Sequence, residues 1–174
     1  MRCCLCLLVF CSVSLTAKDM IRTPSDVPVL GELEEHLVQE LLLKQKNRDA
    51  GLADINQKPG FKALIKKHNL KLFGGPVIGK VTPTSAVVWL RSPDATQVKV
   101  TAQPGNIVGT ASTSKARDFT AEVELKGLKP WTKYSYTLTV NNEPALGLLK
   151  PSFSTAPTRE QKVAFSIAFG GGAR

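Results

Sequence analysis

The fold of this chain is decided by residues 125–138, which read Leu-Lys-Gly-Leu-Lys-Pro-Trp-Thr-Lys-Tyr-Ser-Tyr-Thr-Leu. Gly127 and Pro130 mark a turn, and apolar and polar residues then alternate as in a half-buried strand. Leu128, Pro130 and Tyr134 have the spacing of a tyrosine corner, in which the phenol hydroxyl bonds to the backbone ahead of its own strand. Such corners join the sheets of a Greek-key sandwich, so we predict a structural rather than a catalytic role for Tyr134.

Strand patterns recur at short intervals over residues 73–157, and turn residues separate them. The expected strands are Val77–Val81, Ser85–Arg91, Gln97–Ala102, Ile107–Thr113, Asp118–Leu125, a strand containing Tyr134, and a last strand that runs toward Phe153. Short strands of this kind, with a tyrosine corner at the sixth, are typical of immunoglobulin-like domains. We therefore predict a mainly β fold, an immunoglobulin- or fibronectin-type-III-like sandwich preceded by a short helical segment.

The strand expected at Ser85–Arg91 is apolar on both of its faces. One face carries Val87 and Trp89, and the other carries Ala86, Val88 and Leu90. We expect Trp89 to lie in the core, as a tryptophan does in many immunoglobulin-like domains. The opposite face would then be exposed to water, so we expect it to contact another element.

Residues 18–72 are expected to form the helical segment. Leucines spaced by three and four predict an amphipathic helix over Val29–Asn47, with acidic residues near its start and basic residues near its end. A second short helix is expected over Phe61–Leu70, after a polar connection. Its polar side carries the best candidate for an anion contact, although runs of charge usually face water: Lys62, Lys66, Lys67 and His68. We interpret His36, on the first helix, as a surface histidine.

Residues 1–17 have the pattern of a secretory signal peptide, with a basic start, an apolar centre and Ala17 before a polar chain. A lipoprotein signal ending at Cys11 fits less well, because Phe10 is too bulky for the position before the cysteine. All four cysteines lie in this segment, so the mature chain is expected to have no disulfide and no zinc–cysteine site. We expect a secreted, periplasmic or cell-surface protein with no membrane span after signal cleavage.

The formal net charge is +9, with acidic and basic residues interleaved and only 6% aromatic residues. Nucleic-acid binding calls for a concentrated basic face or for stacking aromatics, so we expect no nucleic-acid partner. A basic exported domain could still lie near anionic envelope polymers or attract anionic substrates.

Three segments carry a resemblance to a known family. Residues 75–89 (Gly-Pro-Val-Ile-Gly-Lys-Val-Thr-Pro-Thr-Ser-Ala-Val-Val-Trp) resemble the opening of the fibronectin-type-III-like N-terminal domain of PhoD-like alkaline phosphatases and phosphodiesterases. Residues 127–136 and Phe153–Pro157 resemble later landmarks of that domain. The similarity covers about half of the chain. Each motif alone also occurs in ordinary fibronectin-type-III modules and in purple acid phosphatases.

The resemblance continues into residues 158–174, where Val163–Phe169 is similar to the first strand of the family's metallophosphoesterase domain. This implies a truncated second domain, whose own continuation would be the partner of the sandwich and would act on phosphate esters. The family often has Ser-Cys after this strand, the cysteine being able to bind metal, whereas this chain has Gly171 and Gly172. The resemblance implies metal ions such as calcium or iron for the missing domain, and none for this chain.

Metal-assisted phosphoester hydrolysis needs carboxylates, histidines and amides that converge on one or two metals. Both histidines lie in residues 18–72, and no cluster of Asp, His and Asn follows Phe169. We therefore assign no catalytic, cofactor-binding or metal residue. The expected function is that of a non-catalytic N-terminal portion of an exported PhoD-like phosphatase. The alternative is a cell-surface adhesion or carbohydrate-binding sandwich without enzymatic activity.

Overall fold

The structure is a computed structural model that describes residues 28–43, 52–164 and 166. The chain divides into two compact units, Met1–Arg48 and Asp49–Arg174. In the first unit, α1 (Pro28–Leu37) is followed by a π-helical turn, η1 (Val38–Leu43). This confirms the expected amphipathic helix up to Leu43. Residues 44–47 and the expected signal segment, 1–17, lie outside the described residues.

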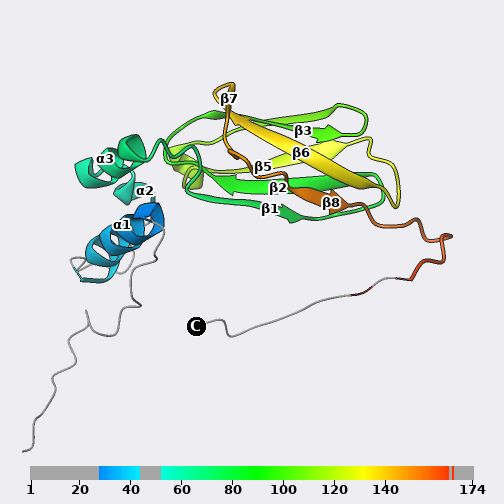
Figure 1. Cartoon of the computed structure of the whole chain (residues 1–174), viewed down its shortest axis with the longest axis horizontal. Helices are drawn as coiled ribbons and strands as arrows, with labels where there is room; N and C mark the ends of the chain where they lie inside the picture. Colours follow the sequence, from blue (N-terminus) through cyan, green and yellow to red (C-terminus); the bar gives the residue numbers. More distant parts are fainter. Residues whose placement is uncertain (1–27, 44–51, 165, 167–174) are drawn as a thin grey trace, which may run out of the picture. The chain divides into compact units, whose positions relative to one another are not determined.

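The second unit is a two-layered antiparallel sandwich (Figure 1). One sheet has the order β1-β2-β5, formed by Gly74–Gly79, Ser85–Arg91 and Thr120–Lys126. The other has the order β4-β3-β6-β7, with β8 also paired to β6, formed by Ile107–Ser112, Gln97–Gln103, Lys133–Val140, Glu143–Pro144 and Ser152–Ser154. The predicted mainly β sandwich is therefore confirmed.

The core lies between the two sheets, where alternate residues of each strand meet. In β6, Tyr134, Tyr136, Leu138 and Val140 are buried, while the residues between them face outward. Strands β2, β3 and β5 alternate in the same way, because successive side chains of a strand point to opposite faces. The apolar residues that alternate in the sequence therefore lie on the inner faces of the two sheets and pack together between them.

The tyrosine corner forms as predicted. The Tyr134 hydroxyl accepts a hydrogen bond of 2.8 Å from the backbone N–H of Lys129. The Tyr134 ring is buried and stacks on Phe153, with ring centroids 5.6 Å apart. The corner therefore joins the turn after β5 to β6 and β8.

The expected position of Trp89 in the core is wrong. Trp89 is 36% exposed, whereas Ala86, Val88 and Leu90 are fully buried and form the core face of β2. The reason is visible in the pairing with β5, where Val88 lies opposite Val123 and Trp89 lies opposite the exposed Glu122. The face that we expected to need a second partner is the face that fills the sandwich.

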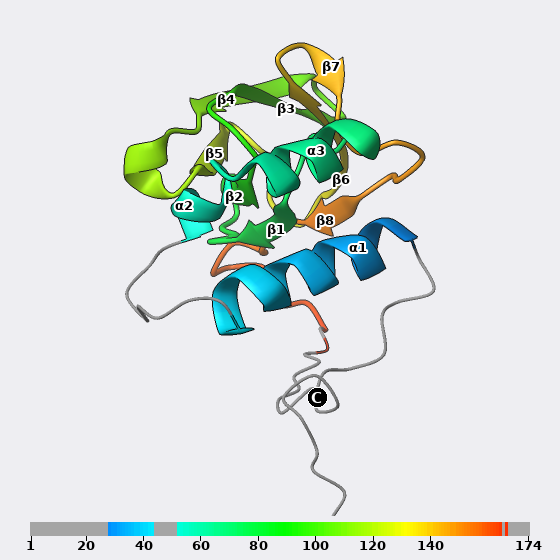
Figure 2. The ribbon, with the colours of Figure 1, turned by 90° about the vertical axis from the view of Figure 1, so that its left-hand side faces the viewer.

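Two short helices, α2 (Leu52–Ile55) and α3 (Pro59–Lys67), belong to the same unit as the sandwich. Figure 2 shows them across one end of the strands. Ile55 and Phe61 are fully buried, and Phe61 packs edge-on against Phe73, with centroids 5.1 Å apart. The sequence indicated only a polar connection where α2 forms, because four residues are too few for a helical period to show.

Beyond β8 the chain has no regular structure in its described part. Val163, Ala164 and Ser166 lie in no helix or strand, and the rest of the strand expected at Val163–Phe169 lies outside the described residues. In the described part of the chain, no helix is long and apolar enough to cross a membrane.

Candidate interaction surfaces

The outward face of the three-stranded sheet carries an apolar stripe, formed by Val77, Val87 and Trp89. Val77 lies directly opposite Trp89 in the β1–β2 pairing, and Gly79 lies opposite Val87. Residues opposite each other in an antiparallel pair share a face, so the three side chains form one continuous strip. Val77 is 54% exposed and Trp89 is 36% exposed. We call this strip the outer stripe.

Glycines next to the outer stripe allow the strands to lie close to the indole. A Cβ on Gly74 would lie 3.6 Å from the Trp89 ring, and a Cβ on Gly75 would lie 2.7 Å from the Trp89 carbonyl oxygen. Gly75 also has a φ of +80°, which side chains other than glycine rarely adopt. The sequence at the start of β1 therefore fixes where Trp89 lies.

Charged side chains border the outer stripe on the β5 side. Lys80 donates a hydrogen bond of 2.7 Å to Glu122, and both side chains are exposed. Surface ion pairs of this kind contribute little to stability. Their effect here is to give an apolar strip a polar edge, which is the usual anatomy of a protein–protein contact.

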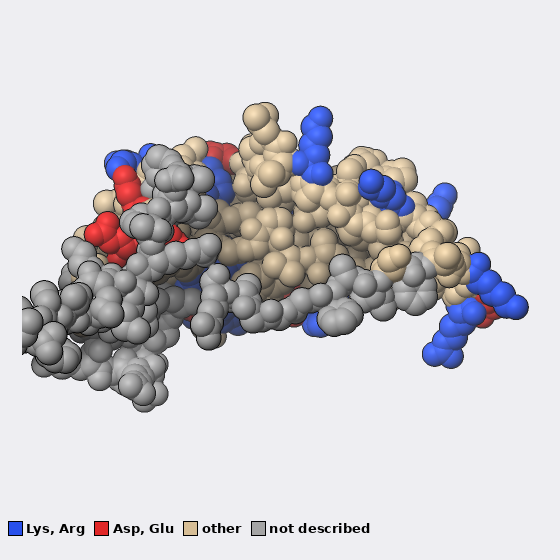
Figure 3. Space-filling view, turned by 60° about the horizontal axis from the view of Figure 1, so that its bottom comes forward, with Lys and Arg blue, Asp and Glu red and all other residues tan. Residues whose placement is uncertain are grey.

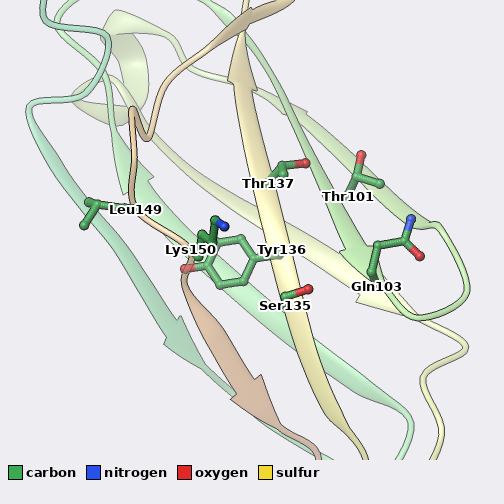
Figure 4. Close-up of a pocket in the computed structure, with 7 residues that line it drawn as sticks. All are labelled: Thr101, Gln103, Ser135, Tyr136, Thr137, Leu149 and Lys150. Atoms are coloured by element: carbon green, nitrogen blue, oxygen red, sulfur yellow. The ribbon is translucent and has the colours of Figure 1, made fainter.

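A second surface is a shallow pocket of about 240 Å³ on the outside of the other sheet. It is lined by residues of β3, β6 and the segment before β8: Thr101, Gln103, Ser135, Tyr136, Thr137, Leu149 and Lys150 (Figure 4). Figure 4 shows the Tyr136 ring beside Lys150, with Thr101 and Gln103 on the other side of β6. The lining combines an apolar floor with hydroxyl, amide and ammonium groups.

In the described part of the chain, the hydroxyl groups of this pocket are not used by the protein itself, whereas the Gln103 amide is hydrogen-bonded to Asn106. Within the described residues, the hydroxyls of Thr101, Ser135, Thr137 and Tyr136 make no hydrogen bond to the protein. Tyr136 is only 5% exposed, and burial raises the pKa of its phenol above the ordinary value. The pocket can offer hydrogen bonds to a hydroxyl-rich ligand, but it holds no arrangement of acid, base and nucleophile.

The residues of the expected anion contact lie on α3 and just beyond it. Lys62, Lys66 and Lys67 are exposed on α3, and His68 is half-buried just beyond it. His36 is half-buried on α1. Among the described residues, no group of three or more His, Cys, Asp and Glu side chains gathers in a way that could hold a metal ion.

The most elaborate polar cluster surrounds Arg91, which sequence reasoning did not single out. Its Nε donates to the Asp118 carbonyl oxygen at 3.0 Å, and its Nη2 donates to Asn56 Oδ1 and Asp118 Oδ1 at 3.2 Å each. Its guanidinium also lies over the Phe73 ring, 4.5 Å from the centroid. Arg91 is 4% exposed, so this cluster attaches the helices to the sandwich and is not available as a site.

A family model described as a domain of unknown function (DUF7800) matches residues 69–158. No curated protein matches the chain.

Several solved structures are similar to part of the chain. A structure of PhoD is 21% identical, with a TM-score of 0.43, over 49% of this chain and 19% of the PhoD chain. A human fibronectin type III domain, from the KIAA0970 protein, is 12% identical with a TM-score of 0.41 and covers 68% of this chain and 96% of its own. The sensor domain of the anti-sigma factor RsgI4 of Pseudobacteroides cellulosolvens is 21% identical with a TM-score of 0.30, over 46% of this chain and 89% of its own.

Proposed function

The chain belongs to the family described as a domain of unknown function, DUF7800, and from this premise we propose that it is the non-catalytic N-terminal portion of an exported PhoD-like metal-dependent phosphatase or phosphodiesterase. In this role the sandwich supports a catalytic domain that follows it. The catalytic domain would supply the metal ions and the phosphate-ester chemistry, and the sandwich would supply a rigid surface beside it.

The observation that carries the proposal is the outer stripe. Val77 and Trp89 are large apolar side chains that the fold leaves about half exposed. Covering them would stabilise a domain contact by roughly 1–2 kcal/mol each, since about half of each side chain is already covered. The two side chains lie directly opposite each other on adjacent strands, so a single covering surface could bury both.

The three segments that resemble PhoD-like proteins support the same proposal. Residues 75–89 form most of β1, the turn after it and most of β2, so they include all three members of the outer stripe. Residues 127–136 form the tyrosine corner, and Phe153–Pro157 leads out of β8. The resemblance therefore lies in the parts that build the sandwich and its proposed contact face.

The test uses the longer protein that the proposal requires, obtained by following the reading frame beyond Arg174. Val77→Ser should lower the thermal midpoint of its phosphatase activity, because the domain contact loses an apolar side chain. Val108→Ser is the matched control, since Val108 is 51% exposed on the other sheet, in β4. The chain itself should hydrolyse neither p-nitrophenyl phosphate nor its diester with added calcium, iron or zinc.

Two results would overturn the proposal. One is metal-dependent hydrolysis by the purified chain itself. The other is an equal effect of Val77→Ser and Val108→Ser on the longer protein, since a domain contact at the outer stripe should respond to only one of them.

A carbohydrate-binding module is the second candidate, and the pocket beside Tyr136 is the observation that favours it. Sugars bind proteins through apolar contacts to the ring and hydrogen bonds to its hydroxyls. Apolar contacts could come from Leu149 and Tyr136, and hydrogen bonds could come from Ser135, Thr137 and Lys150. Backbone amide shifts of residues 135–137 and 149–150 on addition of soluble glycans would support this role, and unchanged shifts across a glycan panel would reject it.

A further inference from the structure

The turn between β5 and β6 displays a large aromatic side chain that folding does not require. Trp131 is 47% exposed, and its φ is +47°, in the left-handed region that bulky residues rarely adopt. Asparagine or glycine would take this conformation with less strain. Among the described residues, the Trp131 indole stacks on no other ring. Neither core packing nor backbone geometry therefore explains a tryptophan here.

The turn that carries Trp131 is held rigidly. The Trp131 backbone N–H donates to the Ala156 carbonyl at 3.1 Å, and the Thr132 N–H donates to Thr155 Oγ1 at 2.9 Å. The Thr132 hydroxyl closes the turn by donating to the Pro130 carbonyl at 2.9 Å. These bonds fix the backbone from which the indole projects, so a partner would not have to order the turn itself.

Cationic side chains accompany the indole on the same part of the molecule. Lys129 and Lys133 flank the turn, and both are exposed. Arg159 and Lys162 follow soon after Ala156, which is bonded to the turn, and both are also exposed. In the described part of the chain, none of these four cations makes an ion pair. Figure 3 shows lysine and arginine side chains at the right-hand end of the molecule, with some acidic surface among them. One exposed acid, Glu160, lies between Arg159 and Lys162 in the sequence, so basic groups remain in excess.

From this arrangement we propose that the β5–β6 turn binds the surface of an anionic phospholipid membrane. An indole has an apolar body and a polar N–H, and it prefers the interface between hydrocarbon and water. Lysine and arginine near such a surface are attracted by its negative potential. A protruding turn with one aromatic and four unpaired cations meets both requirements. It lacks the row of aromatics and the groove with which proteins bind single-stranded nucleic acid.

This inference concerns where the exported module resides, and it is independent of whether a catalytic domain docks on the outer stripe. The contact would be peripheral, because one indole and four cations provide reversible attachment and nothing that spans a bilayer. Raising the salt concentration should weaken it, since the attraction between surface charges is screened over roughly 10 Å at 0.1 M salt.

The experiment exploits the fact that the chain has two tryptophans. Trp89→Phe leaves Trp131 as the fluorophore, and Trp131→Phe leaves Trp89. Each variant is titrated with vesicles of phosphatidylcholine, with and without phosphatidylglycerol. We expect the emission of Trp131 to shift to the blue, and to be quenched by brominated lipid, with the anionic vesicles alone. Trp89 should not respond. Since residues 1–17 contain no tryptophan, their own affinity for lipid does not produce this signal.

A charge-matched pair of variants tests the role of the cations. Replacing Lys129 and Lys133 by glutamine should weaken binding to the anionic vesicles roughly 25-fold, about fivefold for each lysine. Replacing Lys99 and Lys115, which are exposed elsewhere on the sandwich, removes the same charge and should weaken binding much less. Trp131→Asn should keep the thermal midpoint of the parent while losing vesicle binding, which separates a binding role from a folding role.

The proposal is overturned if anionic vesicles shift neither tryptophan, if both respond equally, or if the two lysine pairs have equal effects. It is also overturned if soluble glycerol phosphate or an oligonucleotide shifts Trp131 as strongly as the vesicles do. The turn would then be a general anion contact or a nucleic-acid site.

Discussion

Replacing Arg91 by lysine is expected to destabilise the sandwich by roughly 2–4 kcal/mol, although the charge is kept. The guanidinium reaches three acceptor atoms at 3.0–3.2 Å and covers the ring of Phe73. A lysine ammonium has no planar fork and reaches fewer of these partners. Asn56, which is 2% exposed, would then keep an unpaired Oδ1, and a buried acceptor without a partner costs about 1–3 kcal/mol. The lost contact with the ring adds about 0.5–2 kcal/mol.

Two terms reduce the expected loss. The Asp118 side chain is 43% exposed, so its ion pair with Arg91 is screened by water and contributes about 0–1 kcal/mol. Arg91 Nη1 is buried without a partner among the described residues, so the native cluster already carries a desolvation cost that the variant partly relieves. For these reasons the estimate stays below the upper end of the sum of the two lost contacts.

The assay is urea unfolding followed by circular dichroism, with Arg117→Lys as the matched control. Arg117 is exposed, and it donates to the Ser112 carbonyl at 2.6 Å. This control should change the unfolding free energy by less than about 0.5 kcal/mol, as surface substitutions usually do. If Arg91→Lys unfolded at the same urea concentration as the parent, the Arg91 cluster would not be what attaches α2 and α3 to the sandwich.

Three further predictions follow from the packing. Tyr134→Phe should cost about 1–2 kcal/mol in denaturant melts, because it removes the hydroxyl that accepts from the turn; an unchanged melt would contradict the tyrosine corner. Leu90→Ala should lower the free energy of unfolding by about 2–5 kcal/mol, and Trp89→Ala should lower it less, since only Leu90 is fully buried. A larger loss for Trp89→Ala would indicate that Trp89 lies in the core. The Lys71 ammonium donates a hydrogen bond to the Glu143 carboxylate and attracts its charge, which lowers the pKa of Glu143. The contribution of this pair to folding stability is therefore fully present above the usual carboxyl pKa, and it is lost as the pH falls through the lowered pKa. Stability curves of the parent and Glu143→Gln should therefore converge in acid, and a gap that persists at low pH would contradict this reasoning.

The sequence was sufficient for the strands and for the tyrosine corner, because both are local. Alternation with a period of two shows within one strand, and the Leu, Pro and Tyr of the corner lie within seven residues. The burial of Tyr134 and its bond to the preceding turn followed directly from these patterns.

The orientation of β2 was not settled by its own sequence, since both of its faces are apolar. The size of tryptophan favoured placing Trp89 inside, and that choice was wrong. The neighbouring strand shows which face of β2 points outward, because Glu122 and Glu124 mark the outward face of β5. Trp89 pairs with Glu122 and Val87 with Glu124, so the register places both on the outside. Comparing the two strands before choosing a face would have found the outer stripe.

The Arg91 cluster could not have been predicted from spacing. Its acceptors come from Asn56 and Asp118, which lie 35 and 27 residues away along the chain. The arrangement is produced by tertiary packing, in which α2 and the turn before β5 meet at the end of β2. A buried arginine at the end of an apolar strand has no local pattern that distinguishes it from a surface arginine.

The way the chain leaves the sandwich has a mechanical consequence. Strand β8 has three residues, and a strand this short could be peeled from its neighbour one bond at a time. The next two residues prevent this. The Ala156 N–H donates to the Thr82 carbonyl in the turn between β1 and β2, and the Thr155 hydroxyl donates to the Lys129 carbonyl in the turn between β5 and β6. A pull on residue 157 is therefore shared between the turns at Thr82 and Lys129 before it reaches β8. The place where the chain leaves the sandwich is therefore fixed by both sheets and not by the three residues of β8 alone.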